Sequence, residues 1–394
     1  MKREGSRPLV LHVTNIPTPY RLPYLRAVSD ALHRAGFDFH VFFLGRNKRP
    51  RNWRIAPEDL HGFRNTLHNG ERPIAEAIRL IRLHRPALVV LAWAMDPEAL
   101  RLLFYCVRHR IPTVLFTGET VGTARGRSYP WLRSLVRRPF FLLATRFLTY
   151  GVRSTEYIRS FGVNTARITT GLNVVDTDYF RNSVDALRGE QAGERERARW
   201  LRSDGAPFAC HLLLVGYMIP GKGISSTIRA LEALGRDDIA LHLVGSGPRE
   251  EAHRALVKEA GMEDRVFFHG YHQTDEIPLF YALADVVLFP SFIDVFGLVM
   301  SEAAAAALPV IASKHSGGTA DVVVDGETGI VVDPADTAAY AAAIALLADD
   351  PALRARMGGA ARRRAVGVLT LAESASRYLA AVEATLPRAP EAAR

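Results

Sequence analysis

Cysteine is scarce in this sequence, where only Cys106 and Cys210 occur in 394 residues. They stand in separate halves of the chain, each within an apolar segment. Two such distant cysteines exclude the disulfide frameworks that stabilise small secreted domains, so the fold has to rest on hydrophobic cores. We expect both cysteines to be buried, reduced thiols that pack as small apolar residues.

Long hydrophobic runs are missing as well. No apolar run reaches the roughly 18–20 residues that a membrane-spanning helix needs. The N-terminal segment MKREGSRPLVLHVTN passes from a basic start directly into a strand pattern, without the apolar region of a signal peptide. We therefore expect a cytoplasmic protein. Since 48% of the residues are hydrophobic, a chain of this length is able to form two domains of about 100–200 residues.

Acidic residues are few in the first 180 positions, which hold 13 Asp and Glu against 28 Lys and Arg. The remainder is slightly acidic, and the whole chain carries a formal net charge of +9. We expect the basic half to face an anionic partner. No zinc-finger, RNP or helix-turn-helix signature accompanies the charge, which argues against nucleic acid. An anionic membrane face or a phosphorylated acceptor fits better.

The most informative stretch runs from Ala284 to Pro334. Asp285–Pro290 is an apolar run of buried-strand length, and Leu298–Leu308 is a run of strong helix formers that Pro309 ends. A second buried-strand run, Val310–Ala312, follows, and then a flexible turn leads to a short helix. This order predicts a βαβ unit of a parallel sheet.

Two carboxylates stand eight residues apart across the start of the predicted helix, Asp294 at the mouth between strand and helix and Glu302 two turns down from it. Between them lie backbone N–H groups of a helix N-terminus, which bind anions readily, and Gly297 leaves room for a ligand to approach the backbone. Carboxylates accept hydrogen bonds from the hydroxyls of a sugar or ribose. Polyol and phosphate together indicate a nucleotide sugar.

The same residues carry a family resemblance. Asp294, seven residues and then Glu302-Ala303, with Phe296-Gly297 inside and PVIAS and Gly-Gly following, resemble the signature of retaining GT-B glycosyltransferases of family 4, the glycosyl transferases group 1. The chain departs from it at Asp294, where the family usually has Glu, and at Ala307, where Gly usually stands. The resemblance implies an α/β GT-B fold, with two Rossmann-like domains facing each other across a cleft.

A second motif lies where the resemblance places the donor's diphosphate. The predicted strand Ala209–Gly216 leads to Gly221-Lys222-Gly223 and then to a helix over Ile224–Leu234. A lysine between two glycines at a helix mouth is able to reach a phosphate, and Lys222 matches the family's phosphate-binding lysine. Tyr217 stands where relatives usually have an arginine. The resemblance implies catalytic roles for Asp294, Glu302 and Lys222, and a donor site of Gly216, Tyr217, Lys222, Gly245, Tyr271, His272, Asp294, Val295, Phe296, Gly297, Leu298, Val299 and Glu302.

In the first half, loops that follow predicted strands are candidates for the acceptor site, because strand carboxyl ends line the ligand crevice of open α/β sheets. The strand Leu9–Thr14 is followed by a loop that contains Thr18, Tyr20 and Arg21, and the strand Thr113–Thr117 by Glu119. We expect these four residues to bind the acceptor, with Arg21 contacting phosphate or acceptor. The alternatives are a surface loop with a solvated arginine, and a turn capped by Glu119.

Two segments of the first half are candidates for membrane contact. Arg46–Arg54 is a basic run with one tryptophan, and Arg125–Tyr150 mixes arginines with aromatic residues. Such segments are able to lie on an anionic membrane surface. A solvated loop and an amphipathic helix packed on the sheet are the respective alternatives.

The predicted domain organisation follows from composition. We expect an acceptor-binding Rossmann-like domain over residues 1–185, a charged linker over 186–206 and a nucleotide-sugar-binding domain over 207–370. By analogy with GT-B proteins, the last helix, within 371–394, is expected to cross back to the first domain.

These features predict a retaining hexosyltransferase that moves a sugar from a nucleoside diphosphate donor, expected to be UDP-linked, to a lipid-linked, glycan or small-molecule acceptor. No metal ion or other cofactor is expected, because no ligand spacing such as HExxH occurs and positive groups at the diphosphate replace the ion. Two alternatives remain open: a nucleotide-sugar epimerase on the same fold, and a non-catalytic sugar-nucleotide-binding protein.

Overall fold

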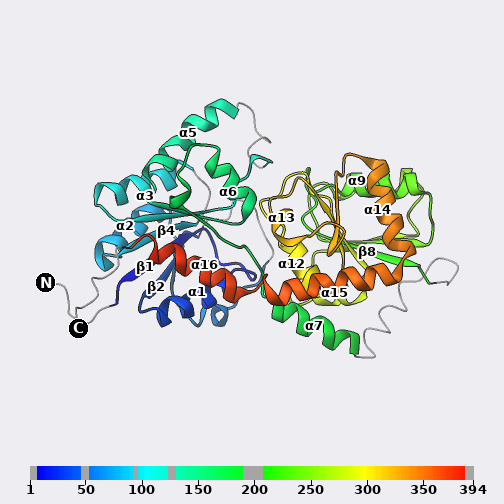
Figure 1. Cartoon of the computed structure of the whole chain (residues 1–394), viewed down its shortest axis with the longest axis horizontal. Helices are drawn as coiled ribbons and strands as arrows, with labels where there is room; N and C mark the ends of the chain where they lie inside the picture. The colour runs from blue at the N-terminus through cyan, green and yellow to red at the C-terminus, as the bar shows by residue number, and fades with distance from the viewer. Residues whose placement is uncertain (1–6, 46–52, 93–95, 123–129, 190–206, 387–394) are drawn as a thin grey trace. The chain divides into compact units, whose positions relative to one another are not determined.

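A computed structural model describes residues 7–45, 53–92, 96–122, 130–189 and 207–386 of the chain (Figure 1). It divides into two compact units. The first unit comprises Met1–Asn173 and Leu371–Arg394, and the second comprises Val174–Thr370. Each unit is built around one parallel β-sheet, as the apolar runs separated by helices predicted.

The first unit holds a seven-stranded sheet in the order β3-β2-β1-β4-β5-β6-β7. All described strand pairs in it are parallel, and the central strands are buried along nearly their whole length. The chain runs outward in one direction from β1 to β3 and in the other from β4 to β7, so the strand order reverses between β1 and β4. The strands are β1 Leu9–Thr14, β2 Asp38–Phe43, β3 Arg64–Leu67, β4 Leu88–Ala92, β5 Thr113–Thr117, β6 Arg146–Thr149 and β7 Ile168–Thr170.

Helices cover both faces of this sheet. One core layer packs α2 Pro73–His84, α3 Pro97–Arg108, α5 Pro130–Leu143 and α6 Val152–Arg159 against the sheet. The other layer packs α1 Leu22–Arg34 and α16 Leu371–Glu383. Two short 3₁₀ turns complete the unit, η1 Pro57–Leu60 and η2 Thr165–Arg167.

The C-terminal helix α16 is an integral part of the first unit. The hydroxyl of Tyr378 lies 3.0 Å from Nδ1 of His12 on β1, and both side chains are buried. The hydroxyl of Ser374 also donates a hydrogen bond to the carbonyl of Leu172. The chain therefore returns from the second unit to complete the core of the first (Figure 1).

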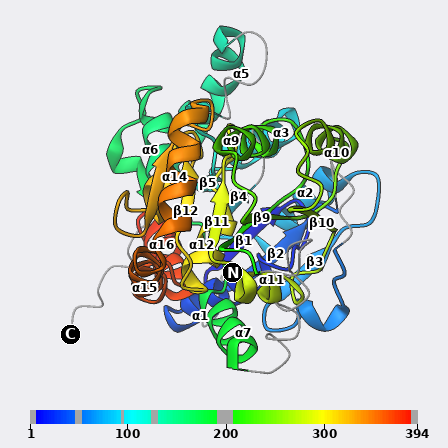
Figure 2. The ribbon, with the colours of Figure 1, turned by 90° about the vertical axis from the view of Figure 1, so that its right-hand side faces the viewer.

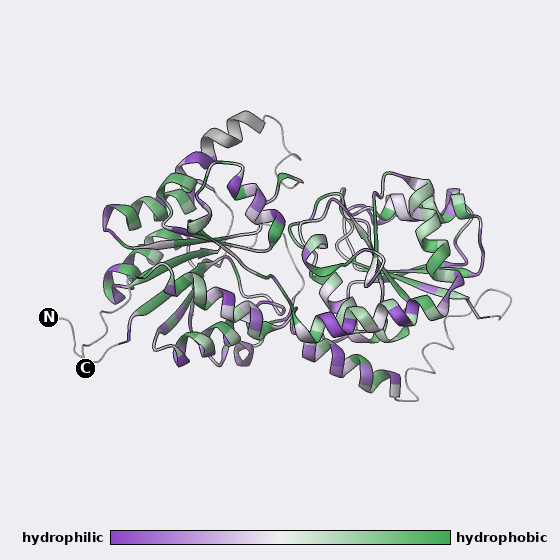
Figure 3. Ribbon diagram, in the orientation of Figure 1, coloured by the Kyte–Doolittle hydropathy of each residue, from purple (hydrophilic) through white to green (hydrophobic). Residues whose placement is uncertain are grey.

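The second unit holds a six-stranded parallel sheet in the order β10-β9-β8-β11-β12-β13. Its inner strands are mostly apolar with almost no exposed side chain, so green predominates along them in Figure 3, and the buried residues His211 on β8 and His242 on β9 interrupt the apolar runs. The strand order reverses between β8 and β11, the two strands from which the sheet grows outward. The strands are β8 Cys210–Val215, β9 Ile239–Val244, β10 Val266–Gly270, β11 Val286–Phe289, β12 Val310–Ser313 and β13 Gly329–Val332.

The helices of the second unit also form two layers. On one face, α9 Ile224–Leu234, α10 Glu250–Glu259 and α14 Thr337–Asp349 pack on the sheet, with α9 and α14 side by side (Figure 2). On the other side α11 Ile277–Leu283 and α12 Leu298–Ala305 contact the strands, and α7 Thr177–Gly189 contacts both helices. The remaining helices are α13 Thr319–Val322 and α15 Pro351–Gly367.

The position of the boundary differs from the prediction. Residues 177–189 form α7, which belongs to the second unit, and the division falls after Asn173 rather than at 186–206. The charged composition of this stretch was misleading, because α7 buries one apolar stripe, including Phe180 and Val184, and exposes the rest. The predicted linker residues 190–206 lie outside the described residues.

Other expectations agree with the structure or fall outside it. Cys106 and Cys210 are buried, and burial raises the pKa of each thiol to about 12. Among the described residues no helix combines the length and the apolar character needed to cross a membrane. Most of the basic run Arg46–Arg54, and residues 123–129 of the aromatic-rich segment, lie outside the described residues.

Candidate functional site

The loops after β8 and β11, the two central strands of the second sheet, are hydrogen-bonded to each other at the carboxyl edge of the sheet. The loop after β8 contains Gly221, whose carbonyl accepts hydrogen bonds from Phe292 N at 2.8 Å and Ile293 N at 3.3 Å in the loop after β11. Gly223 starts α9 and lies against Pro290, so that a Cβ at Gly223 would be 2.1 Å from the Pro290 carbonyl oxygen. These contacts fix the place of the lysine between the two glycines.

Lys222 and Asp294 meet across this junction. Nζ of Lys222 forms an ion pair with Oδ2 of Asp294, and both side chains are mostly buried. The other carboxylate oxygen, Oδ1, accepts the N–H of Phe296 at 3.1 Å. The structure therefore brings together two of the three predicted catalytic residues, which are 72 positions apart in the sequence.

The helix that follows, α12, presents its N-terminus beside this pair. Gly297 is the N-cap with φ 90°, and as a glycine it makes no side-chain cap hydrogen bond. The first-turn N–H groups, including those of Leu298 and Val299, have no acceptor within the helix. A Cβ at Gly297 would lie 2.4 Å from Cζ of Phe289, so glycine is needed here for both conformation and space. Such a helix end favours an anion.

Glu302 lies one helical turn further along α12. Its Oε2 accepts a hydrogen bond from the hydroxyl of Tyr281 on α11 at 2.7 Å. Burial raises the pKa of Glu302 to about 7, and the Tyr281 hydrogen bond lowers it by a smaller amount. Burial also raises the pKa of Tyr281, and the nearby Glu302 adds to that shift. Glu302 is thus a carboxylate held in one orientation that is able to change charge near neutral pH.

The loop after β12 closes the site from the other side. The carbonyl of Phe296 accepts hydrogen bonds from the N–H of Gly318 and the hydroxyl of Ser316, both at 3.0 Å. The N–H of Gly317 binds the carbonyl of Asp294 at 3.0 Å. The predicted donor residue Phe296 is buried, and its N–H and carbonyl are both hydrogen-bonded within the protein, whereas Val295 is 41% exposed.

The backbones of Gly216 and Gly245, two glycines of the predicted donor site, are in direct contact. Gly216 donates its N–H to Val244 at 2.9 Å, and Gly245 donates to Gly270 at 2.7 Å. A Cβ at Gly245 would lie 2.0 Å from the Gly216 carbonyl oxygen. Tyr217 follows directly in the loop after β8, so it occupies the carboxyl edge with Lys222.

Tyr271 and His272 lie farther out, after the edge strand β10. The hydroxyl of Tyr271 is 3.5 Å from Oε1 of Gln273, and Nε2 of His272 donates to the His269 carbonyl at 3.2 Å. Nδ1 of His272 lies 3.4 Å from Glu276. These residues share the edge with Lys222, two strands away from β8.

Three of the four predicted acceptor residues form one turn after β1 in the first unit. The carbonyl of Thr18 accepts the N–H of Arg21 at 2.8 Å, and the ring of Tyr20 packs edge-on against Trp53. Arg21 donates to Asn173 at 2.9 Å and to the hydroxyl of Tyr150 at 2.8 Å. Arg21 is therefore held in place rather than freely solvated.

Glu119, the fourth predicted acceptor residue, follows β5. It forms an ion pair with Arg137 of α5 at 2.5 Å, and Arg137 also donates to the hydroxyl of Tyr157. The backbone N–H of Glu119 lies 3.3 Å from Oγ1 of Thr117. A carboxylate with this partner is oriented by the protein, and its role toward an acceptor stays a prediction.

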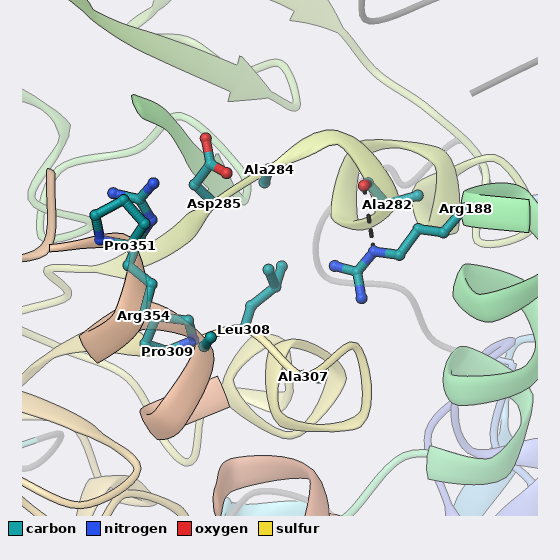
Figure 4. Close-up of a pocket in the computed structure, with 10 residues that line it drawn as sticks. Arg188, Ala282, Ala284, Asp285, Ala307, Leu308, Pro309, Pro351 and Arg354 are labelled. Atoms are coloured by element: carbon teal, nitrogen blue, oxygen red, sulfur yellow. Dashed lines mark hydrogen bonds between the residues drawn. The ribbon is translucent and has the colours of Figure 1, made fainter. Parts of the chain in front are cut away.

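A cavity of about 300 Å³ lies at the opposite, amino-terminal edge of the second sheet (Figure 4). Asp285 and Pro309 line it just before β11 and β12 begin. The guanidinium of Arg188 enters from α7 and donates to the carbonyls of Ala306, Ala282 and Tyr281 at 2.9, 3.4 and 3.4 Å. Ligands of open α/β sheets bind at the carboxyl edge, so this cavity is separate from the Lys222 site.

Sequence reasoning missed the residues that support the site. Tyr281, Ser316 and Arg188 act through contacts between elements that no local pattern indicates. Among the described residues, no three His, Cys, Asp or Glu side chains lie together so that they could hold a metal ion.

Comparison with known proteins concerns mainly the second unit. Residues 206–364 match the family model of glycosyl transferases group 1. A curated relative is a GDP-mannose-dependent alpha-(1-6)-phosphatidylinositol monomannoside mannosyltransferase of Mycolicibacterium smegmatis. It is 36% identical over 201 residues, which cover 49% of this chain and 50% of the relative. The chain thus aligns with about half the length of this relative.

Solved structures share the fold of the whole chain. HepE of Anabaena in complex with UDP has a TM-score of 0.72 at 17% identity, covering 95% of this chain and 99% of that one. A glycosyltransferase of Rickettsia africae has a TM-score of 0.75 at 15% identity, covering 97% and 100%. The predicted fold class is confirmed: the chain has the fold of GT-B glycosyltransferases, two Rossmann-like units with parallel sheets.

Proposed function

We propose that this protein is a glycosyltransferase that moves a sugar from a nucleoside diphosphate donor onto an acceptor. The second unit binds the donor and the first unit binds the acceptor. The transfer is of the hexosyl type, retains the anomeric configuration and uses no metal ion. The family match of residues 206–364 supports the activity, and the roles of individual residues rest on their geometry.

One observation carries the proposal: Lys222, Asp294 and the N-terminus of α12 share the carboxyl edge where the strand order of the second sheet reverses. Such a switch point is where open α/β sheets bind nucleotides. Without donor, Asp294 neutralises Lys222. When a diphosphate enters, Lys222 turns its ammonium to the phosphate oxygens and Asp294 becomes available to the hydroxyls of the donor sugar.

The leaving group explains the arrangement of charges. Cleavage of the bond between sugar and phosphate leaves negative charge on the diphosphate, where Lys222 and the N–H groups of Leu298 and Val299 stabilise it. Glu302 accepts hydrogen bonds from the ribose hydroxyls, with its orientation fixed by Tyr281. No general base is assigned, since a phosphate oxygen of the donor is able to take the proton of the acceptor hydroxyl.

The proposal leaves two nucleotides for the donor sugar, UDP and GDP. The sequence favours a UDP-linked sugar, and HepE of Anabaena was solved with UDP. The mycolicibacterial relative is GDP-mannose-dependent. Both nucleotide classes therefore belong in the first test.

The test is calorimetric titration of the protein with UDP-, GDP-, dTDP- and ADP-sugars. Lys222→Ala and Glu302→Ala are compared with Lys258→Ala on α10 and Glu232→Ala on α9, two exposed control positions. We expect one nucleotide class to bind and both site variants to weaken it by about tenfold or more, since a hydrogen bond to a charged group contributes about 1.5–3 kcal/mol. The controls should bind as the wild type does.

The alternatives predict different outcomes. An epimerase would convert a nucleotide sugar without any acceptor, and a non-catalytic binding protein would bind the donor with no turnover under any condition. Binding that ignores both Lys222→Ala and Glu302→Ala would refute the assigned donor site.

A further inference from the structure

Arg21 occupies an unusual position in the first unit. It ends the loop after β1 and directly precedes α1. The strand order of the first sheet reverses between β1 and β4, so this loop lies at the switch point of that sheet. A crevice outside the carboxyl ends of the strands is the usual ligand position of such a sheet.

The surroundings of the Arg21 guanidinium are neutral. Its two hydrogen bonds go to the amide oxygen of Asn173 and the hydroxyl of Tyr150. Its carbon atom Cζ lies 5.5, 5.6 and 5.1 Å from the ring centroids of Tyr24, Phe116 and Tyr150. In the described part of the chain, no carboxylate lies within ion-pairing distance of Arg21.

A half-buried cation without a counter-charge is destabilised. Complete removal of a guanidinium from water costs several kcal/mol, and Arg21 bears part of this cost, against which nearby aromatic rings return about 0.5–2 kcal/mol. The two described hydrogen bonds use two of the five guanidinium N–H groups, so donor capacity remains. The side chain is only half-buried, so a ligand is able to reach it.

The titratable side chains beside Arg21 supply no negative charge. His12 on β1 is buried, and burial together with the Arg21 charge lowers its pKa to about 3, so it is neutral at physiological pH and, as a histidine, forms no anion there. Tyr24 is neutral as well, because burial raises its pKa. The local electrostatics therefore favour one thing, a negative charge brought by a ligand.

A second observation comes from the same turn. The side chain of Thr18 is 6% exposed, and its hydroxyl has no hydrogen-bond partner in the described part of the chain. Buried hydroxyls are nearly always paired, and an orphaned one needs a reason. The carbonyl of Thr18 accepts the Arg21 N–H, so the orphaned hydroxyl and the uncompensated guanidinium belong to one turn.

We propose that Arg21 and Thr18 form an oxyanion site that binds a phosphate monoester or diester group of the acceptor. The inference rests on the proposed function, because it specifies the acceptor as phosphorylated. The planar fork of Arg21 donates two parallel hydrogen bonds to phosphate oxygens, and the Thr18 hydroxyl donates a third. Tyr150 and Asn173 hold the fork in the orientation in which it receives the phosphate.

Phosphate binding tests the site directly. The donor site also attracts phosphate, so the titration uses protein saturated with the nucleoside diphosphate found by calorimetry, or Lys222→Ala protein if none binds. Inorganic phosphate and glycerol 3-phosphate are titrated against wild type, Arg21→Gln, Arg21→Lys and Arg34→Gln. Arg34 is the matched control, an exposed arginine at the far end of α1.

We expect millimolar binding to the wild type and to Arg34→Gln, at least about tenfold weaker binding to Arg21→Gln and an intermediate value for Arg21→Lys. Thr18→Val should weaken binding about threefold. Phosphate binding to a folded Arg21→Gln protein at wild-type strength overturns the proposal, and so does absence of binding to the wild type at about 10 mM phosphate.

If Arg21→Gln does not fold, side-chain NMR of arginine-labelled wild type replaces it. The Arg21 Nε–H resonance, assigned by its loss in Arg21→Lys, should shift on phosphate addition, and an unmoved resonance overturns the site.

Binding to vesicles distinguishes a lipid phosphate from a soluble one. Arg21-dependent binding to phosphatidylinositol vesicles but not to phosphatidylcholine indicates a lipid headgroup, whereas binding of glycerol 3-phosphate alone indicates a soluble acceptor.

The two proposals fail separately. If no nucleotide sugar binds to the wild type, the donor site is refuted. The phosphate titration of the Lys222→Ala protein then still tests the acceptor site. Normal donor binding with phosphate binding that ignores Arg21 refutes only the acceptor site.

Discussion

The hydroxyl of Tyr281 donates a hydrogen bond to Oε2 of Glu302 at 2.7 Å and so joins α11 to α12. The contact is local in space and distant in sequence, 21 residues apart. It sets the orientation of the carboxylate, and burial sets its charge, because the pKa of Glu302 is raised to about 7. The raised pKa of Glu302 predicts that stability and donor binding depend on pH.

Stability should fall between pH 4.5 and 7 because of Glu302. The pKa of its carboxyl rises from 4.5 to about 7 on folding, so in this window the native state binds more protons than the unfolded state. The stabilisation is fully present below the unfolded pKa and is lost as pH rises through the folded pKa. Relative to Glu302→Gln, the wild type should lose up to roughly 3 kcal/mol across this window.

Urea denaturation at several pH values measures this difference. Glu232→Gln, at an exposed position of α9, is the matched control and should parallel the wild type. A constant difference between wild type and Glu302→Gln from pH 4.5 to 8 would show that the carboxyl of Glu302 has an ordinary pKa.

Donor binding should release protons below neutral pH. Ribose hydroxyls that donate to Glu302 stabilise its ionised form and lower its pKa. At pH 6, where Glu302 is largely protonated, binding should therefore release a substantial fraction of one proton. Calorimetry in two buffers of different ionisation enthalpy measures the number. Equal release by Glu302→Gln would assign the proton to another group.

The sequence predicted the fold class and most inner strands, and it singled out Lys222 and Asp294, which the structure brings together, but it did not indicate the residues that support them. Buried parallel strands are continuous apolar runs, so β8, β9 and β11 were readable. The edge strand β3, with the sequence RNTL, has no such run. Lys222 and Asp294 stood in motifs with local spacing, whereas Tyr281 and Arg188 act through tertiary packing that no periodicity encodes.

Gly297→Ala should disrupt the donor site specifically. Gly297 has φ 90°, and an added Cβ would meet the Phe289 ring at 2.4 Å, so the start of α12 has to move. We expect a loss of about 2–3 kcal/mol in unfolding free energy and a clear loss of donor affinity. Gly261→Ala is the control, since Gly261 has φ 62° with no atom within 4 Å of a Cβ. Equal effects of both substitutions would show that backbone strain alone matters.

Ala307→Gly should stabilise the protein. Ala307 has φ 56°, a left-handed conformation that costs an alanine about 1–2 kcal/mol, and it stands where the family resemblance expects glycine. Glycine removes this strain but loses about 0.5–1 kcal/mol through the greater entropy of the unfolded chain. The net gain should be about 0.5–1 kcal/mol by thermal or urea unfolding. Ala306→Gly, at φ −74°, should instead destabilise, and the same sign for both would contradict the argument.

Arg188→Ala should destabilise the second unit from the side opposite the donor site. The guanidinium of Arg188 donates to the last carbonyls of α11 and α12, at Tyr281, Ala282 and Ala306. Its removal takes the Arg188 donor from these three carbonyls and one positive charge from the helix C-termini, while Arg362 still donates to the neighbouring Ala305 carbonyl.

We expect a loss of about 1–3 kcal/mol for Arg188→Ala. Arg181→Ala is the control on the same helix, because the polar contacts of Arg181 in the described part of the chain are local ones at the surface, with Asp178 and Asn182, and its loss should change stability by less than about 1 kcal/mol. Since the donor site that we propose lies at the other end of α12, Arg188→Ala should also weaken donor binding more than Arg181→Ala does. If Arg188→Ala lowers stability but leaves donor affinity unchanged, Arg188 has only a structural role. The N-terminus of α12 would then keep its position without the support of Arg188 at the other end of the helix.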